Sequence, residues 1–228
     1  QSGFAKARQL LWKQSAERVL KELTRESMRV VFGSREPMDL SKEILERDGI
    51  TIIEMDIETP DHLRVLFQEL LLNYFMLYYL HKGEVEKEHL ETVIFLEEFP
   101  NMLPTSKIEM QTGGEIINKL FKESRKFGLG LVAIAQESSE LPNYVTANCK
   151  VQFNFAAQTK KDIEATAGSM FLKKHEISFL DYIWQGECFA KIKGRVKNCL
   201  VKIPASPIKD RITDEELKEK MTKWKNQN

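Results

Sequence analysis

The stretch Thr92-Val93-Ile94-Phe95-Leu96-Glu97-Glu98-Phe99-Pro100 joins a short apolar run to two adjacent carboxylates. No polar residue interrupts Val93 to Leu96, which is typical of a strand buried on both faces of a parallel sheet. Such a strand ends at the carboxyl edge of the sheet, where open α/β folds bind their ligands. The sequence therefore predicts that Glu97 and Glu98 lie at a ligand-binding edge.

This pair of carboxylates has the form of a Walker B segment. In such a segment, one carboxylate holds Mg²⁺ through water and the next orients the water that attacks a phosphate. The alternative interpretation is a buried strand that is followed by two solvated glutamates. The stretch by itself leaves both interpretations open.

Strands and helices alternate along the rest of the chain. We expect strands over residues 29–32, 50–57, 93–96, 130–135 and 150–155, and a hairpin over 187–193 and 195–202. We expect helices over residues 4–28, 39–47, 60–81, 115–126, 162–167, 176–182 and 214–225, with Thr59 as the N-cap of the third. This order predicts an α/β fold with a mainly parallel sheet flanked by helices, a C-terminal antiparallel hairpin and a helical tail.

The composition excludes several classes of protein. The 228 residues include 34 basic and 34 acidic side chains, so the net charge of zero does not argue for a nucleic-acid partner. The three cysteines, Cys149, Cys188 and Cys199, form no CxxC pair, which suits a reducing cytosol and argues against a zinc site. We expect Cys188 and Cys199 to be reduced and packed. The most apolar stretch, residues 70–80, is too short to span a bilayer, so a cytoplasmic protein is expected.

A phosphate-transfer site also needs a GxxxxGK[ST] loop, and this sequence has none. The nearest match is Gly113 to Leu120, where Asn118 replaces the second glycine and Leu120 replaces the hydroxyl that binds Mg²⁺. Either the loop lies upstream of Gln1 in a longer protein, or the site never hydrolysed a nucleotide. The start at Gln1, without an initiator methionine or a signal pattern, favours the first explanation.

The segment Glu123-Ser124-Arg125-Lys126-Phe127-Gly128-Leu129-Gly130-Leu131-Val132-Ala133-Ile134-Ala135-Gln136 resembles the HerA/FtsK superfamily of hexameric DNA-pumping ATPases. That group includes the motor ATPases of conjugation and type IV secretion. In its members a Walker B strand ends in Asp-Glu or Glu-Glu, a helix ends in Arg-Lys-Phe-Gly, and a buried strand ends in Gln. All three features occur here in that order, and the resemblance covers roughly residues 50–202. It implies a RecA-like P-loop NTPase fold.

The resemblance also implies roles for individual residues. Glu97 would order the water shell of Mg²⁺, and Glu98 would polarise the attacking water. Gln136 corresponds to the sensor residue of the family, which contacts the γ-phosphate or that water. Arg125 corresponds to an arginine that reaches the site of a neighbouring subunit and neutralises charge on the γ-phosphate. Apart from the resemblance, Gly128 and Gly130 are expected to let a helix turn tightly into a strand.

Contacts with DNA would use the phosphate backbone, which needs Lys or Arg but no particular base sequence. The candidates are Lys107, in the loop after the carboxylate pair, and Lys160 and Lys161, before a later helix. Each of the three is also explained by simple solvation. Two segments, Phe99-Pro100 and Glu137-Ser138-Ser139-Glu140, depart from the common pattern of the superfamily, which leaves the nearest subfamily open.

These observations predict part of an ATP- and Mg²⁺-dependent ring motor that translocates DNA. Residues 1–49 would form a helical segment inserted in a larger ATPase domain, 50–204 the C-terminal half of its core, and 205–228 a charged helical tail. The expected partners are further copies in a hexameric ring, double-stranded DNA, and a nuclease or a membrane secretion complex. Without a Walker A loop, we expect the chain by itself to be an inactive ATPase.

Two other interpretations remain. The first is an assembly or interaction module that keeps the ATPase fold without hydrolysing nucleotide. The second is a metal-dependent nuclease, which would need further acidic ligands and a lysine at a fixed offset that the sequence does not offer. The presence of GxxxxGK[ST] in the full-length protein would distinguish the motor from the assembly module.

Overall fold

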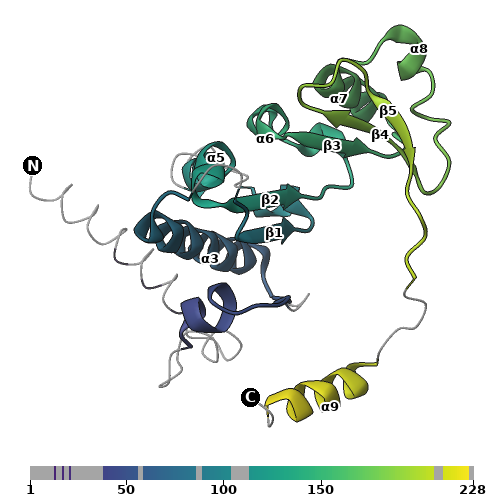
Figure 1. Cartoon of the computed structure of the whole chain (residues 1–228). Helices are drawn as coiled ribbons and strands as arrows, with labels where there is room; N and C mark the ends of the chain where they lie inside the picture. Colours follow the sequence, from purple (N-terminus) through teal and green to yellow (C-terminus); the bar gives the residue numbers. More distant parts are fainter. Residues whose placement is uncertain are drawn as a thin grey trace, which may run out of the picture. The chain divides into compact units, whose positions relative to one another are not determined.

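The computed structural model describes residues 38–55, 59–85, 89–103, 113–207 and 213–225, together with Lys13, Glu17 and Lys21. The chain divides into two compact units, Gln1–Cys149 and Lys150–Asn228 (Figure 1). We describe each unit by itself.

The first unit contains two parallel strands and the helices around them. Its elements are η1 (Ser41–Leu45), α3 (Asp61–Lys82), β1 (Thr92–Leu96), η2 (Phe99–Met102), α5 (Gly113–Glu123), η3 (Ser124–Phe127), β2 (Leu129–Ala133), η4 (Ser138–Glu140) and α6 (Asn143–Asn148). Strand β1 pairs in parallel with β2, so that Thr92 lies opposite Leu129 and Leu96 opposite Ala133. The predicted strands 93–96 and 130–135 are therefore confirmed as neighbours, although β2 ends at Ala133.

One face of this sheet packs into the core of the unit. Ile94 and Leu96 of β1 and Leu131 and Ala133 of β2 point to the same side, because residues two apart on a strand share a face. They pack against buried side chains of α3, α5 and α6, which include Leu72, Met76, Tyr79, Ile117, Leu120 and Val145. Burial of each large apolar side chain stabilises the unit by about 1.5–3 kcal/mol.

The opposite face of the same sheet is open in the described part of the chain. Val93 is 39% exposed, Phe95 is 68% exposed and Val132 is 37% exposed. The prediction that β1 is buried on both faces is therefore wrong for the described residues. Its side chains alternate between the core and solvent, because the described helices cover one face of the pair.

Helix α3 joins the sheet to the rest of the first unit. Pro60 occupies its N-cap position, and the Pro60 carbonyl accepts hydrogen bonds from the amides of Leu63 and Arg64 at 2.9 and 3.1 Å. The prediction of Thr59 as N-cap is therefore wrong by one residue. At the other end of the helix, the Tyr79 hydroxyl shares a hydrogen bond with the Thr92 hydroxyl at the start of β1.

Two sequence expectations before α3 need correction. Residues 50–55 form no strand. Ile50 and Ile52 are 94% and 84% exposed, so their side chains bury little apolar surface against the described residues. The expected helix 39–47 is reduced to the π-helical turn η1. The expected strand 29–32 lies outside the described residues, as does helix 4–28 except for the helical positions Lys13, Glu17 and Lys21.

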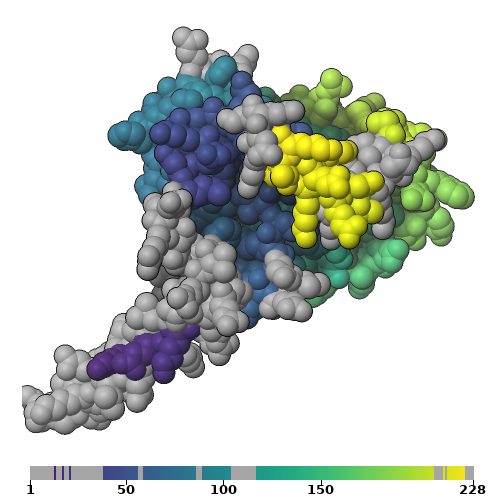
Figure 2. All heavy atoms as spheres, turned by 90° about the horizontal axis from the view of Figure 1, so that it is seen from below, coloured from purple at the N-terminus to yellow at the C-terminus, as the bar shows by residue number. Residues whose placement is uncertain are grey.

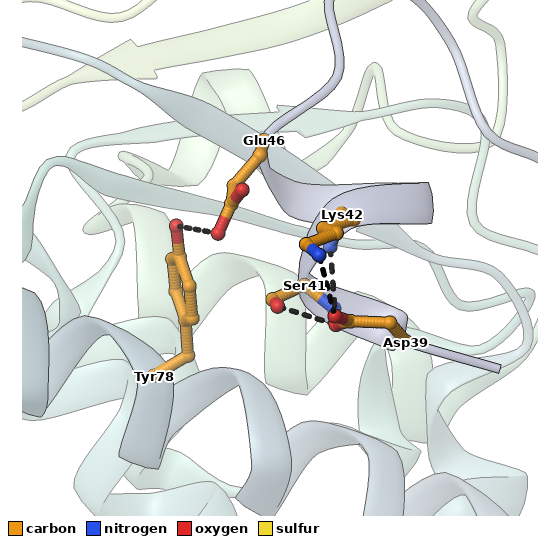
Figure 3. A network of polar contacts seen from close by, with 5 residues as sticks. All are labelled: Asp39, Ser41, Lys42, Glu46 and Tyr78. Atoms are coloured by element: carbon orange, nitrogen blue, oxygen red, sulfur yellow. Dashed lines mark hydrogen bonds and ion pairs between the residues drawn. The ribbon is translucent and has the colours of Figure 1, made fainter. Parts of the chain in front are cut away.

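A small polar network fixes the turn η1 to the unit (Figure 3). Asp39 Oδ1 accepts hydrogen bonds from the Ser41 hydroxyl at 2.6 Å and from the amides of Ser41 and Lys42 at 3.2 and 3.4 Å. The hydrogen bond from Ser41 lowers the pKa of the Asp39 carboxyl. Glu46 accepts a hydrogen bond from the Tyr78 hydroxyl at 3.4 Å, which connects the turn to α3.

The second unit contains an antiparallel sheet. Its elements are β3 (Val151–Asn154), α7 (Lys160–Met170), α8 (Lys174–Ile177), β4 (Glu187–Ile192), β5 (Cys199–Lys202) and α9 (Asp214–Lys225). The strand order is β3-β4-β5 and both pairings are antiparallel. The expected hairpin is confirmed, but a mainly parallel sheet is found only for β1 and β2. Strand β3 departs from the expectation because its partner is the returning strand β4.

The two cysteines of the second unit differ in their exposure to solvent. Met170, Leu180 and Phe189 form its buried core together with Ala157, and Cys188 is 0% exposed. Cys199 is exposed on the edge strand β5, so the expectation of two packed thiols is wrong for that residue, although both thiols are free. The side chains of α9 described by the structure lie at the surface (Figure 2). No helix among the described residues is long and apolar enough to cross a bilayer.

Candidate functional site

The two parallel strands bring Glu97, Glu98 and Gln136 to one edge of the sheet. Glu97 follows the last residue of β1, and Gln136 follows β2 by three residues. The backbone ladder continues beyond both strands, because Ile134 donates to the Leu96 carbonyl at 2.9 Å and Phe99 donates to the Ile134 carbonyl at 2.9 Å. The carboxyl ends of parallel strands meet at the ligand-binding edge of an open α/β sheet, as the sequence predicts.

Glu98 and Gln136 touch each other at this edge. Gln136 Nε2 donates a hydrogen bond to Glu98 Oε1 at 2.5 Å. A hydrogen bond to an ionised carboxylate is about twice as strong as one between neutral groups, so this contact orients the Glu98 side chain. Glu98 is half-buried and Gln136 is exposed, which leaves the pair open to a ligand from the solvent side.

The backbone at Glu98 adopts an unusual conformation. Its φ of 50° and ψ of 43° lie in the left-handed region, which costs about 1–2 kcal/mol for a residue other than glycine. The turn allows Phe99 to enter the core, where it is 0% exposed and its ring lies edge-on to Phe121 at 5.4 Å. Strain of this kind is concentrated at functional sites. Sequence reasoning missed this turn, because Pro100 restricts Phe99 and gives no signal about Glu98.

The chemistry of the carboxylates suits a hard cation. Mg²⁺ is usually held by one or two carboxylates, by water and by the phosphate oxygens of its substrate. Glu97 is exposed at the sheet edge beside Glu98. The described residues form no group of three or more potential metal ligands, so they would supply only part of a coordination shell. This donor set fits a Mg²⁺ that is held mainly through water and phosphate.

Arg125 lies at the opposite edge of the sheet. It belongs to η3, which precedes β2, whereas Gln136 follows β2. The five residues of β2 separate the two edges by about 15 Å, because a parallel strand rises by about 3.3 Å per residue. Arg125 is exposed, so its side chain is accessible to another chain.

Gly128 makes the turn from η3 into β2. Its φ of 69° is left-handed, and a Cβ atom there would lie 3.2 Å from atoms of Val85, His89 and Glu91. The predicted need for glycine at this position is confirmed by both the backbone angle and the close packing.

The remaining candidates are not gathered at this edge. Lys160 and Lys161 are exposed in the first turn of α7 in the second unit, and Lys160 lies 3.9 Å from Glu164. Lys107 lies outside the described residues. The segment Gly113 to Leu120 is part of α5, which confirms that it is not a phosphate loop.

Two solved structures share this fold. The chain matches VirB4 of Thermoanaerobacter pseudethanolicus with a TM-score of 0.51 and 20% identity, over 68% of this chain and 43% of that chain. It matches the genome packaging NTPase B204 of Sulfolobus turreted icosahedral virus 2 in complex with AMPPCP with a TM-score of 0.52 and 14% identity, over 82% of this chain and 92% of that chain. No protein-family model and no curated protein matches the sequence.

The chain therefore shares the fold of these VirB4 and B204 structures. The chain spans less than half of the VirB4 structure that it matches. At these identities the likeness defines the fold, and the activity has to be argued from the site.

Proposed function

We propose that this chain is part of an ATP-hydrolysing ring motor that moves DNA. The observation that carries the proposal is the hydrogen bond between Gln136 and Glu98 at the shared carboxyl edge of two parallel strands. That edge is where ligands bind in open α/β folds. The similarity of the fold to VirB4 and to B204, which was solved with the nucleotide analogue AMPPCP, supports a nucleotide as the ligand.

In this proposal each polar residue at the edge has a separate task. Glu98 accepts a hydrogen bond from the attacking water and orients it, while Gln136 holds the Glu98 carboxylate and contacts the water or the γ-phosphate. Glu97 holds Mg²⁺ through a water molecule. When bound, Mg²⁺ neutralises charge on the phosphate oxygens. Arg125 contributes its guanidinium to the site of a neighbouring subunit, which agrees with its position at the opposite edge of the sheet.

The sequence lacks GxxxxGK[ST], so we assign the phosphate-binding loop to another part of the full-length protein. Residues 50–204 would then be the C-terminal half of a RecA-like core, preceded by a helical insert over 1–49 and followed by a charged tail over 205–228. A hexameric ring would place nucleotide between subunits.

The substrate of the motor is the second part of the proposal. B204 is a genome packaging NTPase, which supports double-stranded DNA as the substrate that the motor translocates. A nuclease or a secretion complex in the membrane would be a further partner. The three free cysteines favour a location in the reducing cytosol.

The test is the steady-state ATPase rate of the full-length protein with and without duplex DNA. Glu98→Gln removes the carboxylate that orients the water, and loss of a general base lowers kcat by about 10²–10⁴-fold. The matched control is Glu137→Gln, an exposed glutamate beside Gln136 with no role in the proposal. DNA-stimulated turnover that is lost only in Glu98→Gln supports the motor. Absence of turnover in a folded, oligomeric parent protein would leave the assembly module as the better function.

A further inference from the structure

The charge of the second unit differs from that of the whole chain. Residues 150–228, which make up this unit, contain 16 Lys and Arg but ten Asp and Glu, a net charge of +6, whereas the full chain has a net charge of zero. Four of these cations lie at one end of the antiparallel sheet. They are Lys150, before β3, and Lys193, Arg195 and Lys197, in the connection between β4 and β5. We call these four residues the basic tip.

The pairing of β3 with β4 places two cations of the basic tip opposite each other. Val151 pairs with Ile192, and the Lys193 amide donates to the Lys150 carbonyl at 2.8 Å, so Lys150 and Lys193 are the next cross-strand pair. Like charges directly opposite in an antiparallel pair are destabilising. The fold therefore holds these lysines together against their repulsion, which an anionic ligand would relieve.

No carboxylate of the described residues neutralises the basic tip. All four of its side chains are exposed, and none of them forms an ion pair within the described part of the chain. Lys160 differs in this respect, because Glu164 lies 3.9 Å from it. The basic tip is therefore a site of uncompensated positive charge.

Three residues of the basic tip lie in the connection between β4 and β5, and a hydrogen bond joins this connection to the end of α7. Asn198 Nδ2 donates to the Met170 carbonyl at 3.1 Å, and the Arg195 amide donates to the Ile192 carbonyl at 3.0 Å. The Lys191 ammonium donates to the Ser169 carbonyl and lies 4.3 Å from the centre of the Phe171 ring. Because it already has these partners, we do not count Lys191 in the basic tip. A turn that hydrogen bonds already hold in place loses less conformational entropy on binding a ligand than a flexible turn does.

We propose that the basic tip binds the phosphate backbone of duplex DNA without reading its bases. The proposal deepens the function above and rests on it for the choice of DNA, whose duplex carries one charge per about 1.7 Å of axis. Binding of single strands relies on aromatic stacking, and residues 193–197 include no aromatic side chain. Binding to a membrane surface needs an apolar face, and Val196 is the one apolar residue of that segment.

The experiment measures equilibrium binding of the full-length protein to a fluorescent 30-base-pair duplex over a series of salt concentrations, without nucleotide. The tip variant combines Lys193→Gln, Arg195→Gln and Lys197→Gln. We expect the slope of log K against log salt to become shallower by about 3, because each phosphate contact contributes about 0.9. At moderate salt the affinity should fall by about tenfold or more.

Two further variants make the result decisive. Lys218→Gln, Lys220→Gln and Lys223→Gln remove the same charge from exposed positions of α9 and should leave the slope unchanged. Lys193→Arg with Lys197→Arg keeps the charge of the tip and should bind like the parent. Retention of the parent slope in the tip variant, or an equal loss in the α9 variant, would overturn the proposal.

The choice of ligand is tested in the same series. Two results would also overturn the assignment to duplex DNA. The first is tighter binding of the parent protein to a single strand than to the duplex. The second is a tip variant that loses binding to phosphatidylserine vesicles but still binds duplex DNA. Binding is measured without hydrolysis, so a protein that lacks ATPase activity can still bind through the tip. A protein that hydrolyses ATP but binds DNA independently of the tip would contradict this inference alone.

Discussion

Gln136 Nε2 donates a hydrogen bond to Glu98 Oε1 at 2.5 Å, across 38 residues of sequence. The two residues follow neighbouring parallel strands, so their meeting is a direct result of the pairing of β1 with β2. The contact fixes one oxygen of the carboxylate and leaves the second available to a water molecule. Gln136 is thus a positioning residue for Glu98 in the proposed reaction.

Removal of this positioning contact should lower turnover. In Gln136→Ala, the Glu98 carboxylate loses its donor and can rotate away from the water, and a misplacement of about 1 Å can lower a rate by about 10²-fold. We expect kcat of the full-length ATPase to fall by about 10–100-fold, with a smaller change in KM for ATP. Steady-state kinetics check this, with Glu137→Gln as the control. An unchanged kcat would show that the contact has no part in turnover.

The left-handed backbone at Glu98 predicts an inverted order of stability for two variants. Alanine is normally the more stable replacement, because glycine loses more conformational entropy on folding. At φ 50° the order should reverse, since alanine keeps the strain of about 1–2 kcal/mol that glycine relieves. We expect Glu98→Gly to unfold at higher denaturant than Glu98→Ala, by about 0.5–1 kcal/mol. Chemical denaturation measures this, and the usual order would contradict a left-handed turn.

The position of Arg125 predicts complementation between inactive subunits. If Glu98 and Arg125 act in different subunits, an equal mixture of Glu98→Gln and Arg125→Ala proteins recovers roughly a quarter of the sites, because random neighbours in a ring supply both intact residues. The mixture should therefore regain ATPase activity that neither variant has alone. A mixture as inactive as its components would place both residues in one subunit or remove Arg125 from the reaction.

The three cysteines should differ in reactivity toward alkylating reagents. Burial raises the pKa of the Cys149 and Cys188 thiols, which lowers their thiolate fraction near neutral pH. Cys188 is also 0% exposed, whereas Cys199 is exposed on β5. Iodoacetamide should modify Cys199 first and Cys188 last, as followed by peptide mass spectrometry. Equal rates in the native protein, as expected in denaturant, would contradict the packing of β4.

Sequence patterns predicted much of the fold where the signal is local. The bounds of α9 match the expected range 214–225, and β1 begins one residue before the expected run 93–96, because a charged helix and an apolar run each carry their own signal. Glu98 and Gln136 were expected at the tips of neighbouring strands, but the hydrogen bond between their side chains was not predicted.

The expectations that were wrong depended on distant parts of the chain. The alternation of Val151 and Phe153 is the same whether β3 pairs in parallel or antiparallel, so it could not reveal that β4 is its partner. Residues 50–55 have the composition of a strand but lack a partner in the described structure. The conformation of Glu98 follows from the burial of Phe99, which no local pattern encodes.

The direction of β2 restricts how copies of this chain can meet. Under the proposed roles, each subunit presents the carboxylate of Glu98 at one edge of its sheet and the guanidinium of Arg125 at the other. A head-to-tail arrangement brings Arg125 of one subunit to the edge that carries Glu98 in the next, and it closes on itself as a ring when the rotation between neighbours divides a full turn. A single strand of five residues, Leu129–Ala133, would thereby give the whole assembly a sense of rotation.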